Sequence, residues 1–165
     1  MPEAQRSLIW LWLSAGILVL DLLTKWLAEA YLLPYQQVPL IDGLFSLMLA
    51  YNPGAAFSFL ASAGGWQRWF FSAVAVVVSI VLVIWLARLS RDKWIEAMGL
   101  SLILGGALGN LYDRVVHGQV VDFILVHWQQ DWFFPAFNVE DSAITVGAVL
   151  LIADMFWPRK AAGTA

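Results

Sequence analysis

The chain alternates long apolar stretches with two more polar segments that contain prolines. Residues 69–87 carry no charged side chain and only two serines. Because about 20 apolar residues cross the hydrocarbon core of a bilayer as a helix, this stretch predicts a transmembrane helix. Three further stretches are apolar but shorter or next to polar residues: residues 8–20, 97–109 and 143–157. We therefore predict four membrane-spanning helices.

The first apolar stretch has a second interpretation. Arg6 precedes it and Ala-Glu-Ala at 28–30 follows it, which is also the layout of a secretory signal peptide. Such peptides rarely carry charges just before the cleavage site, where Asp21 and Lys25 would lie. We therefore treat the stretch as the first span. Asp21 and Lys25 share a helix face at a spacing of four residues, which predicts a structural salt bridge or, alternatively, a role in positioning a site.

The composition indicates that lipid surrounds much of the chain. Hydrophobic residues make up 61% of the sequence and charged residues 13%, against about 45–50% and about 25% in soluble domains. The absence of cysteine excludes disulfides, Cys-ligated zinc and thiol catalysis. Two histidines make a His-rich metal site unexpected, and a net charge of −3 without a basic run indicates no nucleic-acid partner.

The charged residues predict the orientation. Six Lys or Arg residues lie on the side of the two termini: Arg6, Arg88, Arg91, Lys93, Arg159 and Lys160. Three lie on the opposite side: Lys25, Arg68 and Arg114. Since cytoplasmic loops are enriched in Lys and Arg, both termini are predicted to be cytoplasmic. Eight acids and both histidines lie at the other face, where we expect any chemistry: Asp21, Glu29, Asp42, Asp113, Asp122, Asp131, Glu140, Asp141, His117 and His127.

The two outer segments predict a small sheet on the membrane surface. Residues 38–41 and 44–51 flank Asp42-Gly43, a pair typical of the tight turn in a β-hairpin. Prolines exclude a long helix in the first outer segment. The second outer segment, residues 112–137, contains four aromatic residues that are typical of an interfacial anchor: Trp128, Trp132, Phe133 and Phe134.

Asp122 lies in the apolar run Val-Val-Asp-Phe-Ile, where an isolated charge is costly. A structural ion pair with Arg114 or Lys25 would relieve that cost. Alternatively, Asp122 pairs with Asp141, since two carboxyls that share a site hold one proton between them. Such a pair can activate water as a base and protonate a leaving amine as an acid, as in aspartic proteases.

The surroundings of Asp141 leave two interpretations open. Asn138 is a favoured N-cap residue, and an acid three positions later resembles a capping box, so Asp141 could simply stabilise a helix start. Towards the end of the third span, Gly105 and Gly109 form a small-xxx-small pair that permits close helix packing. Asn110 and Arg114 follow on one helix face and would point at that closely packed neighbour.

Five blocks together resemble the bacterial lipoprotein signal peptidase family (signal peptidase II). They are Asp21-x-x-Thr24-Lys25, the run from Asn52 to Ser58 (Asn-Pro-Gly-Ala-Ala-Phe-Ser), the run from Gly105 to Arg114 (Gly-Gly-Ala-x-Gly-Asn-x-x-Asp-Arg), Gly118-x-Val120-Val121-Asp122-Phe123, and Phe137-Asn138-x-x-Asp141. Their order and spacing extend over nearly the whole chain. The resemblance implies one membrane-embedded peptidase domain over residues 1–165.

The fold implied by the resemblance is an all-α membrane protein of the inner membrane. It would have four transmembrane helices, a small extracytoplasmic sheet (a β-cradle) and a periplasmic loop that closes over the site. The implied activity is that of an aspartic endopeptidase without metal or cofactor. It would act near the periplasmic face on diacylglyceryl-modified prolipoproteins, cutting before the lipidated cysteine. Membrane lipid and a globomycin-type inhibitor are the other implied partners, and we expect a monomer.

The resemblance also assigns roles to residues. Asp122 and Asp141 match the catalytic pair. Positions around the substrate match Asn52, Gly54, Asn110, Arg114 and Asn138. Polar positions with a structural role match Asp21, Lys25 and Asp113.

One position departs from the family pattern, which has alanine where this chain has Glu140. On a helix, a side chain one position before Asp141 points about 100° away from it. Glu140 would then only add a favourable acid to the first turn. If it turned towards the pair, it would raise the affinity of the pair for protons.

Two other classes of function remain open from the residues alone. A proton-coupled transporter would also place acids at membrane level, but the acids here gather at one face and no inverted repeat is visible. A structural membrane subunit would need Asp122 or Asp141 for folding or assembly and would cleave no peptide bond.

Overall fold

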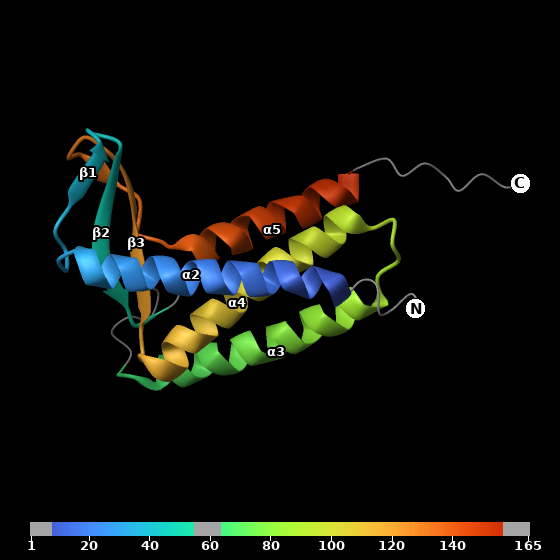
Figure 1. Cartoon of the computed structure of the whole chain (residues 1–165). Helices are drawn as coiled ribbons and strands as arrows, with labels where there is room; N and C mark the ends of the chain where they lie inside the picture. Colours follow the sequence, from blue (N-terminus) through green and yellow to red (C-terminus); the bar gives the residue numbers. More distant parts are fainter. Residues whose placement is uncertain (1–7, 55–63, 157–165) are drawn as a thin grey trace, which may run out of the picture.

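A computed structural model describes residues 8–54 and 64–156 as a helical bundle with a small sheet at one end (Figure 1). The helical elements are η1 (Leu8–Trp10), α2 (Leu11–Tyr31), α3 (Trp66–Arg88), α4 (Trp94–Val116) and α5 (Val139–Phe156). The strands are β1 (Val38–Ile41), β2 (Phe45–Asn52), β3 (Val120–Trp128) and β4 (Trp132–Phe133). The described residues do not include three of the charges used above for the orientation, Arg6, Arg159 and Lys160, nor residues 55–58 of the second sequence block.

Three helical segments are long and apolar enough to cross a membrane: Leu8–Tyr31, Trp66–Arg88 and Trp94–Val116. They correspond to the first three predicted spans. α5 corresponds to the fourth, but it has only 18 residues and begins with two acids, Glu140 and Asp141. The fold is therefore helical with a small antiparallel sheet, and three of its helices are candidates for membrane spans.

α4 extends beyond the apolar stretch 97–109 at both ends. Its last turns carry Asn110, Asp113 and Arg114, and the helix can continue there because the latter two side chains are buried against the rest of the bundle. The helix ends at Val116, and Gly118 follows with a φ of +80°, a conformation that glycine adopts without strain. The backbone N–H groups of His117 and Gly118 both donate to the carbonyl of Asp113, which completes the C-terminal turn.

α4 is the central helix, and it packs against α2, α3 and α5. α3 and α5 run antiparallel to α4, whereas α2 runs in the same direction as α4 (Figure 1). At Gly105 the backbones approach so closely that an added Cβ would lie 2.9 Å from the carbonyl oxygen of Ser14 in α2. The close packing predicted from Gly105 is thus present.

The sheet has the order β1-β2-β3-β4, with antiparallel pairing. The predicted hairpin is confirmed: β1 pairs with β2, and Gly43 in the turn has φ +73°. The apolar run around Asp122 proves to be a central strand, β3, in which Asp122 lies opposite Ala50. That pairing places the end of β2, and with it Asn52, beside the buried part of β3.

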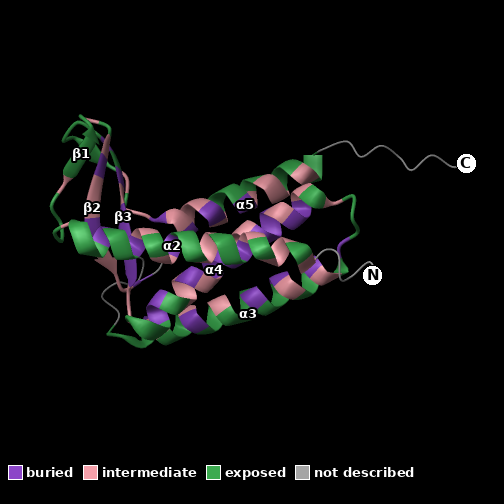
Figure 2. Cartoon of the chain, viewed as in Figure 1, coloured by how far each residue is buried: buried purple, intermediate pink, exposed green. Residues whose placement is uncertain are grey.

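Buried residues lie where the helices face one another, and exposed residues lie on the outer surface of the bundle (Figure 2). The outward side chains of α3 include exposed Val77, Val81 and Ile84, as expected for a helix in contact with lipid. Trp128, Trp132 and Phe133 are exposed on the sheet. The interfacial anchor formed by these residues stays a prediction.

Candidate active site

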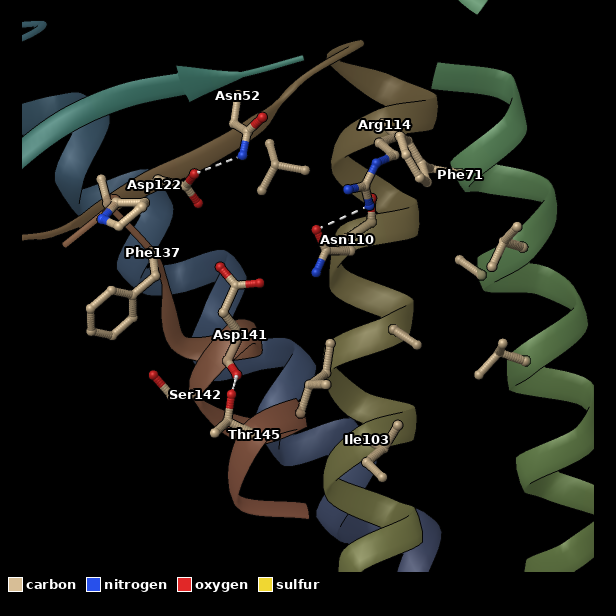
Figure 3. A pocket seen from close by; sticks show the side chains of 18 of the residues that line it. Asn52, Phe71, Ile103, Asn110, Arg114, Asp122, Phe137, Asp141, Ser142 and Thr145 are labelled. Carbon is tan, nitrogen blue, oxygen red and sulfur yellow. Dashed lines mark hydrogen bonds between the residues drawn. The ribbon is translucent and has the colours of Figure 1, made fainter. Parts of the chain in front are cut away.

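A cavity of about 700 Å³ lies between α3, α4 and α5, next to the sheet. Figure 3 shows its side chains, which come from elements far apart in the sequence. The polar lining residues are Asn52, Asn110, Arg114, Asp122, Asp141, Ser142 and Thr145. The apolar lining includes Phe71, Val74, Val78, Ile103, Ile144 and Val146. The cavity thus joins a cluster of hydrogen-bonding groups to an apolar wall formed by the helices.

Asp122 reaches the cavity from β3 and is only 4% exposed. Its Oδ1 accepts a hydrogen bond from Asn138 Nδ2 at 2.8 Å, and its Oδ2 accepts one from Asn52 Nδ2 at 3.3 Å. Among the salt bridges of the described residues, neither Arg114 nor Lys25 pairs with Asp122. Of the two alternatives left open for Asp122, the structural ion pair is therefore not formed, because two asparagine amides bind the carboxylate oxygens.

The environment of Asp122 favours its protonated form. Burial and the nearby charge of Asp141 raise its pKa from 3.8 to about 7, although the hydrogen bonds from Asn52 and Asn138 and the charge of Lys25 act in the opposite direction. Desolvation and a neighbouring acid both disfavour ionisation. Asp122 is thus a carboxyl that can gain or lose a proton near neutral pH.

Asp141 lies in the first turn of α5, where its backbone N–H donates to Asn138 Oδ1 at 2.9 Å. Asn138 is thus the N-cap residue, as predicted. The carboxylate of Asp141 is not confined to a capping role, since it lines the cavity and points towards Asp122 in Figure 3. The structure therefore brings the two predicted aspartates to one cavity.

Arg114 links α4 to the end of β2. Its Nη1 donates to the side-chain oxygen of Asn110 at 3.0 Å, and its Nη2 donates to the carbonyl of Gly54 at 3.2 Å. The guanidinium also lies over the ring of Phe71, 5.5 Å from its centroid. Asn110 and Asp141 both line the cavity. These contacts fix a donor-rich side of the cavity opposite Asp122.

A second polar cluster lies behind the cavity and is centred on Lys25. Its Nζ lies 2.7 Å from Asp21 Oδ2 and 2.7 Å from Asp113 Oδ2, and it also donates to Glu140 Oε1. The predicted Asp21–Lys25 salt bridge is thus present, within a larger group. The four side chains are all almost fully buried. Among the described residues, no group of His, Asp or Glu is arranged to hold a metal ion.

Glu140 does not turn towards Asp141. Its side chain is fully buried against Lys25, and its backbone N–H donates to Asp21 Oδ1 at 3.2 Å. The sequence left two directions open for the Glu140 side chain, and the structure shows the one that points away from Asp141. The sequence offered no sign that Glu140 would meet Lys25, because the two are far apart along the chain. Phe71 is a further lining residue without a local signal, since it lies in an uninterrupted apolar span.

These features define a small membrane protein in which a buried carboxyl, Asp122, and a half-buried one, Asp141, share a cavity at one end of a helical bundle. The family profile described as signal peptidase (SPase) II matches residues 13–157. The chain therefore belongs to the signal peptidase II family.

Curated relatives cover nearly the same length. Lipoprotein signal peptidase of Ectopseudomonas mendocina is 61% identical over 164 residues, covering 98% of this chain and 97% of the relative. Lipoprotein signal peptidase of Pseudomonas aeruginosa (strain UCBPP-PA14) is 59% identical over 162 residues, covering 97% and 96%. The corresponding protein of Pseudomonas putida is 61% identical over 161 residues, covering 96% and 94%.

Two solved structures, both described as bacterial membrane enzymes, share the fold. One has a TM-score of 0.78 at 27% identity, covering 92% of this chain and 87% of the other. The second has a TM-score of 0.75 at 27% identity, covering 92% and 93%.

Proposed function

We propose that this protein is a lipoprotein signal peptidase that removes signal peptides from prolipoproteins by an aspartic mechanism. Family membership and the names of full-length relatives support the reaction. The catalytic type rests on one observation: Asp122 and Asp141 approach the same cavity from a strand and a helix. The raised pKa of Asp122, caused by burial and then by Asp141, supports a pair that retains one proton at neutral pH.

The chemistry requires one proton on the pair. The ionised carboxylate takes a proton from a water molecule, whose oxygen then bonds to the carbonyl carbon of the scissile peptide. The protonated carboxyl stabilises the resulting oxyanion. When the C–N bond breaks, the departing nitrogen receives a proton from the pair and leaves as an amine. The products are a peptide carboxylate and a free amino terminus.

The polar residues in and around the cavity have supporting roles in the proposed reaction. Asn52 and Asn138 orient Asp122 through the hydrogen bonds to its two oxygens. Arg114 and Asn110 present donors on the opposite side, where they would hold carbonyl groups of an extended substrate. Gly54 accepts from Arg114 and keeps the end of β2 near the cavity. Asp21, Lys25 and Asp113 hold α2, α4 and the start of α5 together.

The proposed substrate is a diacylglyceryl-modified prolipoprotein, cut before the lipidated cysteine. The apolar wall of the cavity would receive the lipid-bearing side of the substrate while its peptide crosses the two aspartates. A globomycin-type peptide would compete for the same cavity. α5 would act as a fourth span, with both termini cytoplasmic and the sheet at the periplasmic face of the inner membrane.

The decisive experiment measures cleavage of a diacylglyceryl prolipoprotein by the purified protein, by Asp122→Asn and by Asp141→Asn. Thermal unfolding of each variant shows whether it is folded. We expect cleavage by the parent and a loss of at least about 100-fold in each folded variant, since acid–base groups contribute about 10²–10⁴-fold. Cleavage at the parental rate by either folded variant would refute the assignment of the pair.

A further inference from the structure

The Lys25 cluster contains more acidic than basic groups. Three carboxylates, those of Asp21, Asp113 and Glu140, surround one ammonium. Glu140 and Asp21 are the most buried of these acids, since both side chains are 0% exposed. One oxygen of Glu140, Oε2, is buried without a hydrogen-bond or salt-bridge partner within the described residues. A buried group left this way is costly, so the arrangement calls for a role beyond packing.

Asn138 connects this cluster to the candidate active site. The same nitrogen, Nδ2, lies 2.8 Å from Asp122 Oδ1 and 3.4 Å from Glu140 Oε1. This amide nitrogen therefore lies within hydrogen-bond reach of both carboxyl groups, and it also donates to the carbonyl of Val121 at 3.2 Å. Glu140 directly precedes Asp141 in the chain.

We propose that Glu140 is a positioning residue that sets the pH range in which the Asp122–Asp141 pair works. Its carboxylate occupies Lys25 and reaches Asn138, and its negative charge lies behind both aspartates. This inference rests on the function proposed above, because it concerns the same site. Glu140 itself contacts neither the cavity nor a substrate.

The direction of the effect follows from the charges. Lys25 favours the ionised form of Asp122. A carboxylate bound to Lys25 offsets that influence and adds a negative charge of its own, which makes each proton of the pair harder to remove. The charged groups that face Glu140 from the surrounding elements are Asp21 and Lys25 of α2 and Asp113 and Arg114 of α4. Asp122 of β3 is linked to it through Asn138, and Asp141 follows it in α5.

The test compares pH–rate profiles for cleavage of a diacylglyceryl prolipoprotein. Glu140→Gln keeps the size of the side chain and an oxygen for Lys25 but removes the charge. We expect it to remain active and to shift both limbs of the profile towards lower pH by about 1 pH unit or more. Coulomb's law with an effective dielectric constant of about 20 gives about 1 unit at a separation of about 12 Å and a larger shift at shorter range. Glu140→Ala should shift the profile in the same direction.

Glu96→Gln is the matched control. Glu96 is also a buried acid in the first turn of a helix and pairs with Lys93, but it lies at the other end of α4 from the cavity. This variant should keep the parental profile. Thermal unfolding of all variants separates loss of stability from a change in titration.

Two results would overturn the inference. Parental profiles in both Glu140 variants would show that its charge does not reach the pair, and a shift towards higher pH would contradict the sign. Neither result touches the proposed function, which depends on the parent and the two aspartate variants. If the parent itself does not cleave the substrate, the proposed function fails first.

Discussion

Asn138 donates a hydrogen bond from Nδ2 to Asp122 Oδ1 over 2.8 Å, which ties the start of α5 to β3. The other end of the same amide, Oδ1, accepts from the backbone N–H of Asp141. One fully buried side chain therefore fixes the position of Asp122 and of the helix turn that carries Asp141. The relative placement of the two aspartates depends on this amide.

Asn138→Ala should lower both stability and activity. Loss of an N-cap amide costs about 0.5–2 kcal/mol, and Asp122 loses its shorter hydrogen bond. We expect a lower unfolding temperature and a fall of at least about 10-fold in kcat, with a smaller change in KM, because positioning contributes to the chemical step. Asn138→Asp keeps the cap but places a third acid beside the pair. A parental kcat in Asn138→Ala would contradict the role given to the amide.

The raised pKa of Asp122 predicts how stability depends on pH. Burial and the charge of Asp141 raise the pKa to about 7 in the folded protein, against about 3.9 in an unfolded chain. Between these values the folded state binds more protons than the unfolded state, so this group lowers the free energy of unfolding as pH rises from about 4 to about 7. The loss is a few kcal/mol at most, at about 1.4 kcal/mol per pKa unit.

Asp122→Asn removes this titration. The difference in unfolding temperature between the variant and the parent should therefore move in favour of the variant as pH rises from 5 to about 8. Thermal unfolding in one detergent across that range measures it. A difference that is constant with pH would show that Asp122 does not hold its proton near neutrality.

The activity of the parent should fall on the alkaline side. Because the pair needs one proton, loss of the last proton near pH 7 predicts a decline in kcat/KM above that value. The measurement is the pH profile of prolipoprotein cleavage with thermal unfolding at each pH. A rate that keeps rising to pH 9 would exclude a shared proton as the acid.

Arg114 should not be replaceable by lysine. Its guanidinium donates to Asn110 and to the Gly54 carbonyl from different nitrogens and lies over Phe71. A lysine ammonium cannot reproduce that fork or the stacking. We expect Arg114→Lys to lower kcat/KM by about 10-fold or more, mostly through KM. Arg68→Lys is the control and should bind substrate normally, since Arg68 donates to the carbonyl of Val115 and does not line the cavity.

Gly109 should be coupled to Glu140. An added Cβ at Gly109 would overlap Glu140 Oε2 and lie 3.1 Å from Asp21 Oδ2. Overpacking of this kind costs about 1–3 kcal/mol. We therefore expect a lower unfolding temperature for Gly109→Ala and a partial recovery in the double variant Gly109→Ala/Glu140→Ala. Additive effects of the two substitutions in a double-mutant cycle would contradict the contact.

The sequence by itself determined the elements and most of the candidate residues. Length and apolar character predicted the spans, because a helix needs about 20 apolar residues to cross a bilayer. Asp42-Gly43 predicted the turn between β1 and β2, since that pair supplies the backbone conformation that a tight turn requires. The capping role of Asn138 and the salt bridge between Asp21 and Lys25 are local relationships within one helix or its start, so spacing alone revealed them.

The tertiary structure decided which polar groups meet across elements. Asp122 accepts hydrogen bonds from two asparagine amides and forms no ion pair with Arg114 or Lys25, because β3 pairs with the end of β2 and the start of α5 lies beside it. Glu140 points at Lys25, a contact between helices that no spacing in one helix encodes. Such pairings depend on how close the backbones come, and here that distance is set by small residues such as Gly109 on the packed face of α4.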